Sequence, residues 1–439
     1  MISGLILVVC YVVVGCAAAF LAVWLGATGS SFLYEAGKLA GLSGFTLLVL
    51  QAVLAARWKW VSRPYGLDIV YRFHRWMGLF AGLLLLVHPV MLAAGGAGWG
   101  LIFSLEVPWH IWFGKAVLVV LAVNLVVSFF RKNIAVRFER WRLLHGVAGV
   151  FLLAGGFAHS WFAGSDFAEP VLAGLWIALL AGGVVVFGHH RFVRPAVLRR
   201  RPYKVKRVKG EAEGVWTVEL ERPEGQEVLD YMPGQFHFIT LHRGPGLPEE
   251  EHHFTISSSP AQEGLVGSTI KAVGDFTSTI GQTSEGDTAT VQGPFGRFSY
   301  KVHPEERDIV FIAGGIGITP VMSMLRCMRD RREDYRVLLL YANKTESSIV
   351  FREEIEQIEA REYPQLEVVH VLSRASEEWD GEKGHIDREI LERHVGGDVG
   401  GKSFYICGPE AMRESVVSQL KHMGVKDGRI RTEIFSLAD

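Results

Sequence analysis

The sequence has only four cysteines, and their spacing does not suit a metal-binding or disulfide framework. Cys10 and Cys16 lie in the first apolar segment, whereas Cys327 and Cys407 lie far apart in the second half of the chain. Without a Cys-x-x-Cys spacing, neither a structural zinc site nor an appended iron–sulfur domain is expected. The lack of a disulfide framework agrees with a reducing compartment for the second half.

The chain also lacks a strong net charge of either sign, because 45 Lys and Arg residues nearly balance 46 Asp and Glu residues, which gives a formal net charge of -1. No nucleic-acid partner is expected. The 439 residues suffice for two or three domains, and their averages conceal a split. Nearly all long apolar runs precede about residue 190, and most charges follow it. This split predicts a membrane half followed by a soluble half.

Six apolar segments are each long enough to span a bilayer, which takes about 20 residues. The first has no basic leader and exceeds the apolar region of a signal peptide, so we expect it to be retained. The segments lie near residues 2–25, 35–56, 73–95, 110–130, 143–163 and 170–188.

The connections between these segments differ in charge. Residues 57–75, 131–142 and 189–207 are rich in Lys and Arg, and the alternate connections near 26–34, 96–109 and 164–169 contain none. By the positive-inside rule, both termini and the whole soluble half face the cytoplasm. We therefore expect a multi-pass protein of the cell (inner or plasma) membrane.

Two of the predicted spans carry histidines at the same spacing. The third reads HRWMGLFAGLLLLVH from His74 to His88, and the fifth reads HGVAGVFLLAGGFAH from His145 to His159. Fourteen helical residues return to within roughly 40° of the starting direction, so both histidines of each span share one face. They rise about 21 Å along the axis, which places one histidine near each leaflet.

Because the third and fifth spans run in the same direction, the histidines form an inner pair (His74, His145) and an outer pair (His88, His159). Imidazole suits iron, and axial histidines commonly hold haem. Zinc is the other contender, although no carboxylate or thiolate accompanies either pair. Two stacked b-type haems are our interpretation. Room for flat macrocycles could come from nearby glycines, which are also common in membrane helices for packing alone: Gly78, Gly82, Gly146, Gly149, Gly155 and Gly156.

The alternative is that these histidines bind no haem. They would then be interfacial or core residues of a transporter or receptor bundle. We prefer the haem interpretation because two helices share the same pair, spacing and direction. His110, His189 and His190 have no matching partners and are assigned no ligand role.

The second half changes pattern twice. From about residue 202, short β-rich runs with Gly, Pro and acidic turns predict a small antiparallel barrel. After about residue 305, strands alternate with helices, which predicts a doubly wound α/β domain with a parallel sheet. The predicted fold is therefore a multi-domain chain, with an all-α six-helix transmembrane bundle at 1–195, an antiparallel β-barrel at 196–302 and the α/β domain at 303–439.

Three motifs in this half can carry chemistry. AGGIGITP, from Ala313 to Pro320, follows a predicted strand and opens a helix, a context in which glycines let the backbone approach a pyrophosphate. HHFTISSSP, from His252, offers an aromatic ring and hydroxyls at a strand end, and Lys271 in the following run can hold phosphates. ICGPEAM, from Ile406, lies where doubly wound folds bind ligands, although Cys407 could be only a small buried hydrophobe.

In order and spacing, HHFTIS, GPFGRFS (Gly293 to Ser299), AGGIGITP and CGPEAM resemble the ferredoxin-NADP reductase module. Behind a six-span bundle with paired histidines, they resemble the ferric reductase and NADPH oxidase superfamily, of bacterial type. The resemblance implies an NAD(P)H-dependent transmembrane oxidoreductase with an FAD-binding barrel, an NAD(P)-binding α/β domain and two b-type haems.

The resemblance also implies roles for single residues. His252 is expected to contact the cofactor and Phe435 to cover the flavin, and Thr255, Cys407 and Phe435 are the expected catalytic residues. Ser373 and Arg374 follow the strand that commonly binds the 2′-phosphate, and the guanidinium favours NADPH over NADH. The remaining expected contacts are Phe254, Thr255 and Ser257 with the isoalloxazine; Lys271, Gly274 and Thr277 with the FAD diphosphate; Gly314, Gly315, Gly317, Thr319 and Pro320 with the nicotinamide dinucleotide; and Cys407, Gly408 and Pro409 with the nicotinamide.

Two departures separate the chain from the animal oxidases. These read His-Pro-Phe-Thr where this chain reads His252-His253-Phe254-Thr255, and here SLAD follows Phe435. No EF-hand loop precedes the first span, so calcium control is not expected.

The implied activity carries electrons from cytoplasmic NADPH (or NADH) through FAD, the inner haem and the outer haem to a small acceptor outside. Ferric iron is our first choice of acceptor. The alternatives are O2, which would make the protein a superoxide-producing oxidase, and an extracytoplasmic protein. The expected partners are the lipid bilayer, NAD(P)H and the small acceptor, with a possible homo-oligomer.

Overall fold

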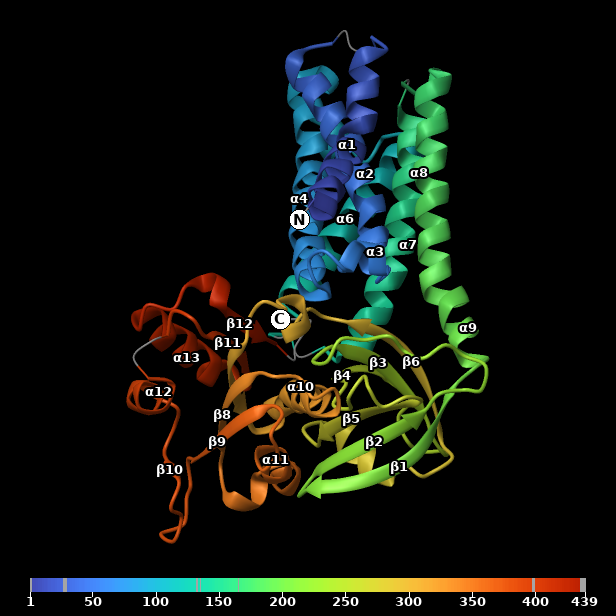
Figure 1. Cartoon of the computed structure of the whole chain (residues 1–439). Coiled ribbons are helices and arrows are strands. Elements are labelled where there is room, and N and C mark those ends of the chain that lie inside the picture. The colour runs from blue at the N-terminus through green and yellow to red at the C-terminus, as the bar shows by residue number, and fades with distance from the viewer. Residues whose placement is uncertain are drawn as a thin grey trace. The chain divides into compact units, whose positions relative to one another are not determined.

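The computed structural model describes residues 2–26, 30–131, 133–134, 136–164, 166–396 and 399–434. It divides into two compact units, Met1–Pro195 and Ala196–Asp439. The first unit is helical, and the second contains one antiparallel and one parallel sheet (Figure 1). The predicted fold class is confirmed.

Within the described residues, six helices of the first unit are long and apolar enough to cross a membrane, as the sequence predicts. π-helical turns extend two of them, at Ala93–Ala97 and at His189–Val193. The six are α1 (Ile2–Trp24), α2 (Phe32–Ala55), α4 (Leu67–Leu92), α6 (Trp109–Phe129), α7 (Phe138–Ala163) and α8 (Pro170–Gly188). The shorter helices of this unit are α3 (Lys59–Ser62), α5 (Gly100–Phe103), a 3-10 turn at Asp166–Ala168, and α9 (Arg194–Arg199), which continues into the second unit.

Two long helices begin earlier than the apolar runs predict. α4 begins at Leu67 rather than near 73, directly after Gly66, whose φ of 93° ends the preceding turn. α7 begins at Phe138 rather than near 143. The added turns carry charge, such as the Asp68–Arg72 ion pair at 3.3 Å. A helix can extend beyond the hydrocarbon core, where charge is tolerated, so hydropathy alone underestimates its length.

The helices of the bundle pack in pairs, with α4 along α2 and α7 along α6. Glycines make this close approach possible. A Cβ at Gly44 of α2 would lie 2.7 Å from Leu85 of α4, and a Cβ at Gly155 of α7 would lie 2.7 Å from Val117 of α6. Small residues at such contacts are typical of membrane helices, because packing rather than the hydrophobic effect drives helix association in lipid. Each histidine-bearing helix therefore has its own partner helix.

The first sheet of the second unit is antiparallel throughout. Just after residue 255, at the end of one edge strand, the amide of Ser257 donates to the carbonyl of Gly267 in the other edge strand at 2.8 Å, so the two edges of the sheet meet and the sheet closes on itself. Its strands, in spatial order, are β4 (Glu251–Thr255), β3 (Phe236–His242), β6 (Thr288–Phe295), β1 (Tyr203–Ala212), β2 (Val215–Glu221) and β5 (Leu265–Lys271).

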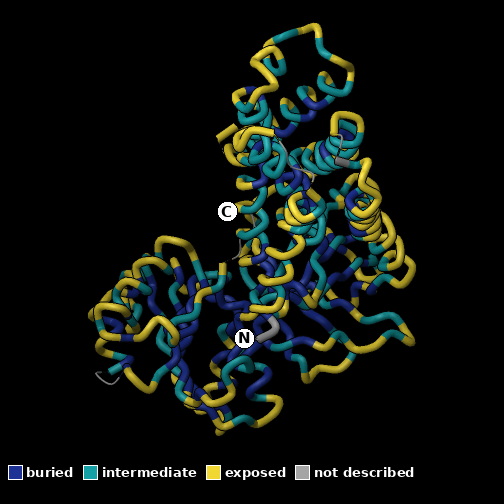
Figure 2. The backbone as a smooth tube through the Cα atoms, turned by 90° about the horizontal axis from the view of Figure 1, so that it is seen from above, coloured by how far each residue is buried: buried dark blue, intermediate teal, exposed yellow. Residues whose placement is uncertain are grey.

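The second sheet is parallel and covered by helices on both faces. α10 (Ile318–Asp330) and α11 (Arg352–Glu359) pack on one face, and α12 (Arg388–Val395) and α13 (Glu410–His422) pack on the other. Buried residues accordingly concentrate in the strands of this unit, whereas the long helices of the first unit show many exposed residues (Figure 2). The strand order is β10 (Glu382–Lys383), β9 (Gln365–Leu372), β8 (Arg336–Asn343), β7 (Asp308–Gly314), β11 (Ser403–Cys407) and β12 (Ile430–Glu433).

The strand order reverses between β7 and β11, which makes this the topological switch point of the sheet. In doubly wound folds, ligands bind in the crevice at the carboxyl ends of the strands at such a point. The motifs AGGIGITP and CGPEAM follow these two strands.

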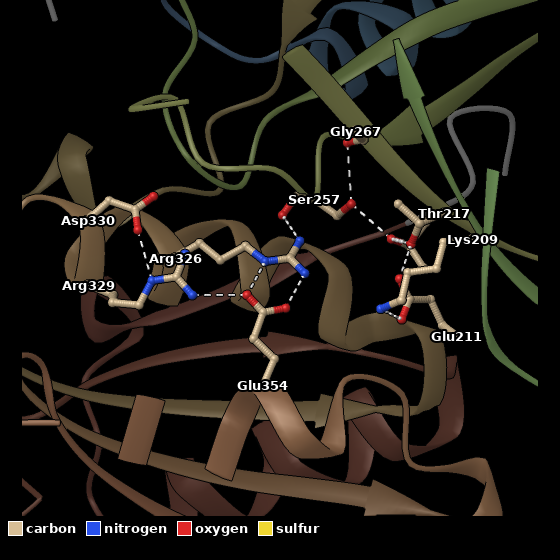
Figure 3. Close-up of polar contacts among 10 residues, drawn as sticks. Lys209, Glu211, Thr217, Ser257, Gly267, Arg326, Arg329, Asp330 and Glu354 are labelled. Atoms are coloured by element: carbon tan, nitrogen blue, oxygen red, sulfur yellow. Dashed lines mark hydrogen bonds and ion pairs between the residues drawn. The ribbon is translucent and has the colours of Figure 1, made fainter. Parts of the chain in front are cut away.

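An arginine on α10, one of the helices that cover the second sheet, ties that sheet to the first (Figure 3). Arg326 of α10 donates one N–H to the carbonyl of Ser257 at 2.7 Å and two others to the carboxylate of Glu354, at 2.9 and 2.5 Å. Arg329 donates to the same carboxylate at 3.1 Å. One helix turn before Arg326, the hydroxyl of Ser323 donates to the carbonyl of Ser258 at 2.8 Å. The segment after β4 is therefore held by α10 through its backbone.

The side chain of Ser257 continues this network into the first sheet. Its hydroxyl lies 2.9 Å from that of Thr269, which lies 2.8 Å from that of Thr217. Thr217 in turn donates to Glu211 at 2.8 Å (Figure 3). One continuous polar chain thus runs from α11 through Ser257 to β1.

The pH dependence of this junction can be predicted from Glu354. Burial alone would raise the pKa of its carboxyl, but the hydrogen bonds and charges of Arg326 and Arg329 outweigh burial and hold this pKa below its ordinary value. A carboxyl with a lowered pKa stabilises the fold at neutral pH, and this contribution is lost as the pH falls through the lowered pKa. We expect Glu354→Gln to lower the free energy of unfolding by roughly 1–3 kcal/mol at pH 7, and the deficit to shrink as acid protonates the wild-type carboxyl.

The measurement is urea unfolding of the full-length protein in detergent at several pH values. The release of bound FAD is the signal that reports unfolding. Glu392→Gln is the matched control, because Glu392 forms an exposed helical ion pair with Arg388. Such pairs contribute little, so this variant should lose less than about 0.5 kcal/mol. A deficit of Glu354→Gln that stays constant with pH would contradict the prediction.

Candidate functional site

The two histidines of the inner pair face each other across the bundle. The ring centres of His74 on α4 and His145 on α7 are 6.2 Å apart, and the ring planes are inclined by 68°. Two metal–nitrogen bonds of about 2 Å, with each nitrogen on the edge of its ring, put two ring centres about 6 Å apart. The observed separation therefore fits one metal ion between the two imidazoles.

The outer pair is oriented by backbone carbonyls of the neighbouring helices. Nδ1 of His88 donates to the carbonyl of Gly37 in α2, and Nδ1 of His159 donates to the carbonyl of His110 in α6, both at 2.8 Å. A carbonyl can only accept, so each Nδ1 carries the proton and each Nε2 presents a lone pair. This is the arrangement by which metal-ligating histidines are held.

The inner pair is held differently. Nδ1 of His145 lies 3.1 Å from Oδ1 of Asn124 and 3.3 Å from the hydroxyl of Ser128, both on α6. Nε1 of Trp141 donates to the same hydroxyl at 3.1 Å. Nδ1 of His74 is buried and has no hydrogen-bond partner within bonding distance among the described residues, and the backbone of Gln51 is the polar group beside it.

Two glycines make room for the outer imidazoles. A Cβ at Gly41 would lie 2.8 Å from Nδ1 of His88, and a Cβ at Gly114 would lie 2.5 Å from Nδ1 of His159. Either contact is too short for real side chains, so a larger residue would displace the ring. Neither glycine was singled out from the sequence.

The donor set of each pair fits haem better than zinc. Within the described part of the chain, the clusters of three or more potential metal ligands include none of the four histidines. A structural zinc site takes four protein ligands, and each pair offers two. Haem supplies the four equatorial nitrogens itself and needs only axial ligands. Residues 74, 88, 145 and 159 therefore fit two bis-histidine haems.

The predicted flavin-binding residues lie on and after β4. Thr255 and Ser257 are buried, and Phe254 is half-buried. The ring of His252 stacks on Phe276, with centres 4.2 Å apart, and its Nε2 lies 3.0 Å from Glu250. Phe276 belongs to the run that carries Lys271 and Thr277, so the two predicted FAD-binding segments lie together.

The predicted diphosphate loop is shaped by one hydroxyl. Oγ1 of Thr277 accepts from the amides of Val273 and Gly274, both at 2.9 Å. These two amides are therefore occupied by the loop itself. Lys271 and Gly274 are exposed, which leaves the Lys271 ammonium accessible to a phosphate.

A buried histidine without a signature in the sequence supports β4, the strand that carries the predicted flavin contacts. His237 of β3 is fully buried, and burial lowers its pKa to about 3, so the ring is neutral. Its Nε2 lies 2.7 Å from the hydroxyl of Ser268, which donates to the carbonyl of Thr255 at 3.0 Å. The alternation of buried and exposed positions along a strand does not reveal which buried position holds a histidine that fixes a neighbouring strand.

The two motifs at the switch point touch through glycines. A Cβ at Gly317 would lie 2.2 Å from the carbonyl oxygen of Cys407, and a Cβ at Gly314 would lie 2.8 Å from Pro409. A Cβ at Gly408 would lie 3.0 Å from the amide of Gly314. The structure thus brings together the residues predicted to hold the nicotinamide dinucleotide.

The other residues predicted to contact the dinucleotide lie at the start of α10. Gly315 has a φ of 53°, Thr319 donates to the carbonyl of Ile316 at 3.1 Å, and Pro320 is buried in the first turn of α10.

The three predicted catalytic residues have different surroundings. The Cys407 side chain is fully buried in the core, and burial raises the pKa of its thiol well above the ordinary value, so the thiol is protonated. Thr255 is buried at the end of β4. Phe435 lies outside the described residues. Their catalytic roles stay predictions.

The residues predicted to bind the 2′-phosphate lie where β8 and β9 end. The amide of Ser373 donates to the carbonyl of Asn343 at 3.0 Å, and that of Arg374 donates to the carbonyl of Lys344 at 2.8 Å. Arg374 and Lys344 are both exposed, so two cationic side chains start from adjacent points of the sheet edge. Lys344 was not predicted, because its neighbour in space is thirty residues away in the sequence.

Three families match successive stretches of the chain. Residues 40–156 match the ferric reductase like transmembrane component, 202–300 the oxidoreductase FAD-binding domain, and 311–418 the oxidoreductase NAD-binding domain. The first match includes His74, His88 and His145. It also includes the groups described above that contact the four histidines, except Gly37. His159 lies just beyond it.

Single proteins are similar over about half of the chain. The plasma membrane-associated coenzyme Q6 reductase PGA3 of Saccharomyces cerevisiae is 29% identical over 47% of this chain and 66% of its own length. A nitrate reductase (NADPH) of Emericella nidulans is 31% identical over 48% of this chain and 27% of its own length. The chain thus spans less than two thirds of these relatives.

Among solved structures, the FAD/NAD-binding domain of a nitric oxide dioxygenase from Vibrio cholerae is 24% identical, with a TM-score of 0.48. The similarity covers 53% of this chain and 97% of that domain. The three family matches, in the order that the sequence motifs predict, agree with the ferric reductase and NADPH oxidase superfamily: a ferric reductase-like transmembrane domain is followed by FAD-binding and NAD-binding oxidoreductase domains, in a chain with six candidate membrane spans.

Proposed function

We propose that this protein carries electrons from cytoplasmic NAD(P)H through FAD and two b-type haems to ferric iron on the outer side of the cell membrane. The observation that carries the proposal is the arrangement of the histidines. Two imidazole pairs lie on α4 and α7, and at the outer pair both Nδ1 atoms donate to carbonyls, which leaves both Nε2 atoms as ligands. Histidines are costly in hydrocarbon and mark functional sites there, and two pairs on facing helices suit metal ligation.

FAD and haem would supply complementary chemistry. Bound FAD accepts a hydride and releases single electrons, and haem iron carries one electron at a time. Phe254, Thr255 and Ser257 would hold the flavin ring, and Lys271 and Thr277 its diphosphate. The switch-point glycines and Cys407–Pro409 would hold the nicotinamide dinucleotide.

The chain contributes position rather than acid–base chemistry. Arg326 and Ser323 hold the carbonyls of Ser257 and Ser258, so the flavin-binding strand and the nucleotide-binding sheet keep one geometry. Gly314 and Gly317 leave the backbone accessible at the switch point. Reduction of Fe(III) by one electron requires no proton, so no general acid is needed at the outer end.

The orientation in the membrane rests on charge. The connections 57–75, 131–142 and 189–207 are rich in Lys and Arg, and the alternate connections contain none. This asymmetry supports a cytoplasmic reductase unit, on the side where NAD(P)H is made.

The histidine pairs predict how haem is lost on substitution. We expect His74→Ala or His145→Ala to remove one haem and His88→Ala or His159→Ala to remove the other, because each haem needs both of its axial ligands. The measurement is haem per bound FAD in purified protein, with reduced-minus-oxidised spectra. His110→Ala is the matched control: it keeps the backbone carbonyl that accepts from His159, so both haems should remain. Unchanged haem content in His88→Ala would overturn the proposal.

The two exposed cations at the ends of β8 and β9 predict coenzyme preference. We expect Arg374→Ala and Lys344→Ala each to raise KM for NADPH about tenfold or more, because a charged hydrogen bond to phosphate contributes roughly 1.5–3 kcal/mol. KM for NADH, which lacks that phosphate, should hardly change. Arg388→Ala, which removes an exposed cation on α12, is the control and should alter neither value. An equal rise for both coenzymes would contradict a 2′-phosphate site.

The acceptor can be identified directly. NADPH is added to the purified protein without oxygen until the haems are reduced, and an Fe(III) chelate or O2 is then added separately. We expect rapid haem reoxidation by iron with formation of Fe(II), and slow reoxidation by O2. Fast reoxidation by O2 with stoichiometric superoxide would instead identify an oxidase.

A further inference from the structure

We propose that Asn124 and Ser128 of α6 are positioning residues for the inner haem, and that the identity of these side chains sets its redox potential independently of the outer haem. The inference rests on the proposed haem function and concerns the groups behind the ligands. It follows from a repeated pattern on α2 and α6.

The groups beside the histidines repeat with the same spacing as the histidines themselves. On α2, Gly37 contacts His88 and the backbone of Gln51 lies beside His74, and these two are fourteen residues apart. On α6, His110 contacts His159 and Asn124 contacts His145, again fourteen residues apart. On each partner helix, α2 and α6, one face therefore lies beside both an inner and an outer histidine.

At the outer level, a glycine uncovers each carbonyl. In an α-helix, the carbonyl of residue i points toward residue i+4, whose side chain shields it. Residue i+4 is Gly41 for the carbonyl of Gly37 and Gly114 for that of His110. A Cβ at either glycine would lie within 2.8 Å of the histidine ring, so only glycine lets the imidazole reach the carbonyl.

At the inner level, the same position is not glycine, and the hydrogen bonding changes. Ala55 follows Gln51 by four residues, and Nδ1 of His74 lacks a partner within bonding distance among the described residues. Ser128 follows Asn124 by four residues, and there the carboxamide of Asn124 takes the place of the shielded carbonyl, at 3.1 Å. The hydroxyl of Ser128 adds a second contact at 3.3 Å.

Ser128 also joins His145 to an aromatic neighbour. Nε1 of Trp141 donates to its hydroxyl at 3.1 Å, and the indole lies 5.1 Å from the imidazole, inclined by 30°. The ring of His145 is thus held at Nδ1 by two side chains and along one face by a third. In the part of the chain that the structure describes, Nδ1 of His88 and Nδ1 of His159 each donate to a backbone carbonyl instead of a side-chain acceptor.

This difference has a consequence for the two irons. An acceptor at Nδ1 makes the imidazole a stronger electron donor through Nε2, which stabilises oxidised iron. At the outer pair the acceptors are backbone carbonyls, which side-chain substitution leaves in place. At the inner pair the acceptor belongs to Asn124, so a single substitution can remove it.

The test is a potentiometric titration of purified full-length protein. We expect Asn124→Leu, which keeps the side-chain volume but removes the acceptor, to raise the midpoint potential of one haem and leave the other unchanged. Ser128→Ala should move the same haem in the same direction by less. The affected haem is identified as the inner one if it is absent from the spectrum of His74→Ala.

Gly114→Ala provides the reciprocal variant. Its added Cβ would displace His159, so we expect loss of the outer haem while the inner haem keeps its wild-type midpoint. Val123→Leu is the matched control, since this exposed neighbour on α6 should alter neither haem. Bound FAD per protein shows in each case that the reductase unit is intact.

The outcomes separate the two proposals. Wild-type protein without bis-histidine haem would overturn the proposed function. Two haems in the wild type, with Asn124→Leu shifting neither midpoint or both equally, would overturn only the role of Asn124 and Ser128.

Discussion

The constraint on which the membrane unit depends is the hydrogen-bonding capacity of a buried imidazole. A neutral imidazole has one N–H and one lone pair, and in hydrocarbon each needs a partner. The structure provides for the N–H of His88 and His159 with carbonyls of α2 and α6. The lone pairs at Nε2 remain, and under the proposed function a haem iron would satisfy them. The pairing of α4 with α2 and of α7 with α6 therefore follows from what the histidines require as well as from helix packing.

In the reductase unit, the corresponding constraint is the hydrogen bonding of one short segment. Ser257 and Ser258 follow the strand that carries the predicted flavin contacts, and their carbonyls accept from Arg326 and Ser323 of the neighbouring domain. The hydroxyl of Ser257 meanwhile joins the barrel through Thr269. A single turn of chain thus links the two domains, and Glu354 keeps Arg326 in place.

Much of this could be predicted from the sequence because it is periodic or local. Apolar runs predicted all six spans, and two identical histidine spacings predicted which helices carry the inner and outer pairs. The strand–turn–helix context indicated AGGIGITP and CGPEAM as two ligand-binding turns, and the structure places them in contact, with Gly317 against Cys407. The beginnings of α4 at Leu67 and α7 at Phe138 were missed because hydropathy does not distinguish a charged helical turn from a loop.

The sequence by itself determined the order of domains, the fold class and the four histidines, since each depends on side-chain pattern within one segment. Only the tertiary structure decided what stands behind those histidines. A backbone carbonyl such as that of Gly37 has no signature in a sequence, and Asn124 is an ordinary polar residue until α7 lies against α6. Likewise Lys344 joins Arg374 only because β8 and β9 are neighbours in the sheet. These contacts come from residues distant in the chain, and packing alone brings them together.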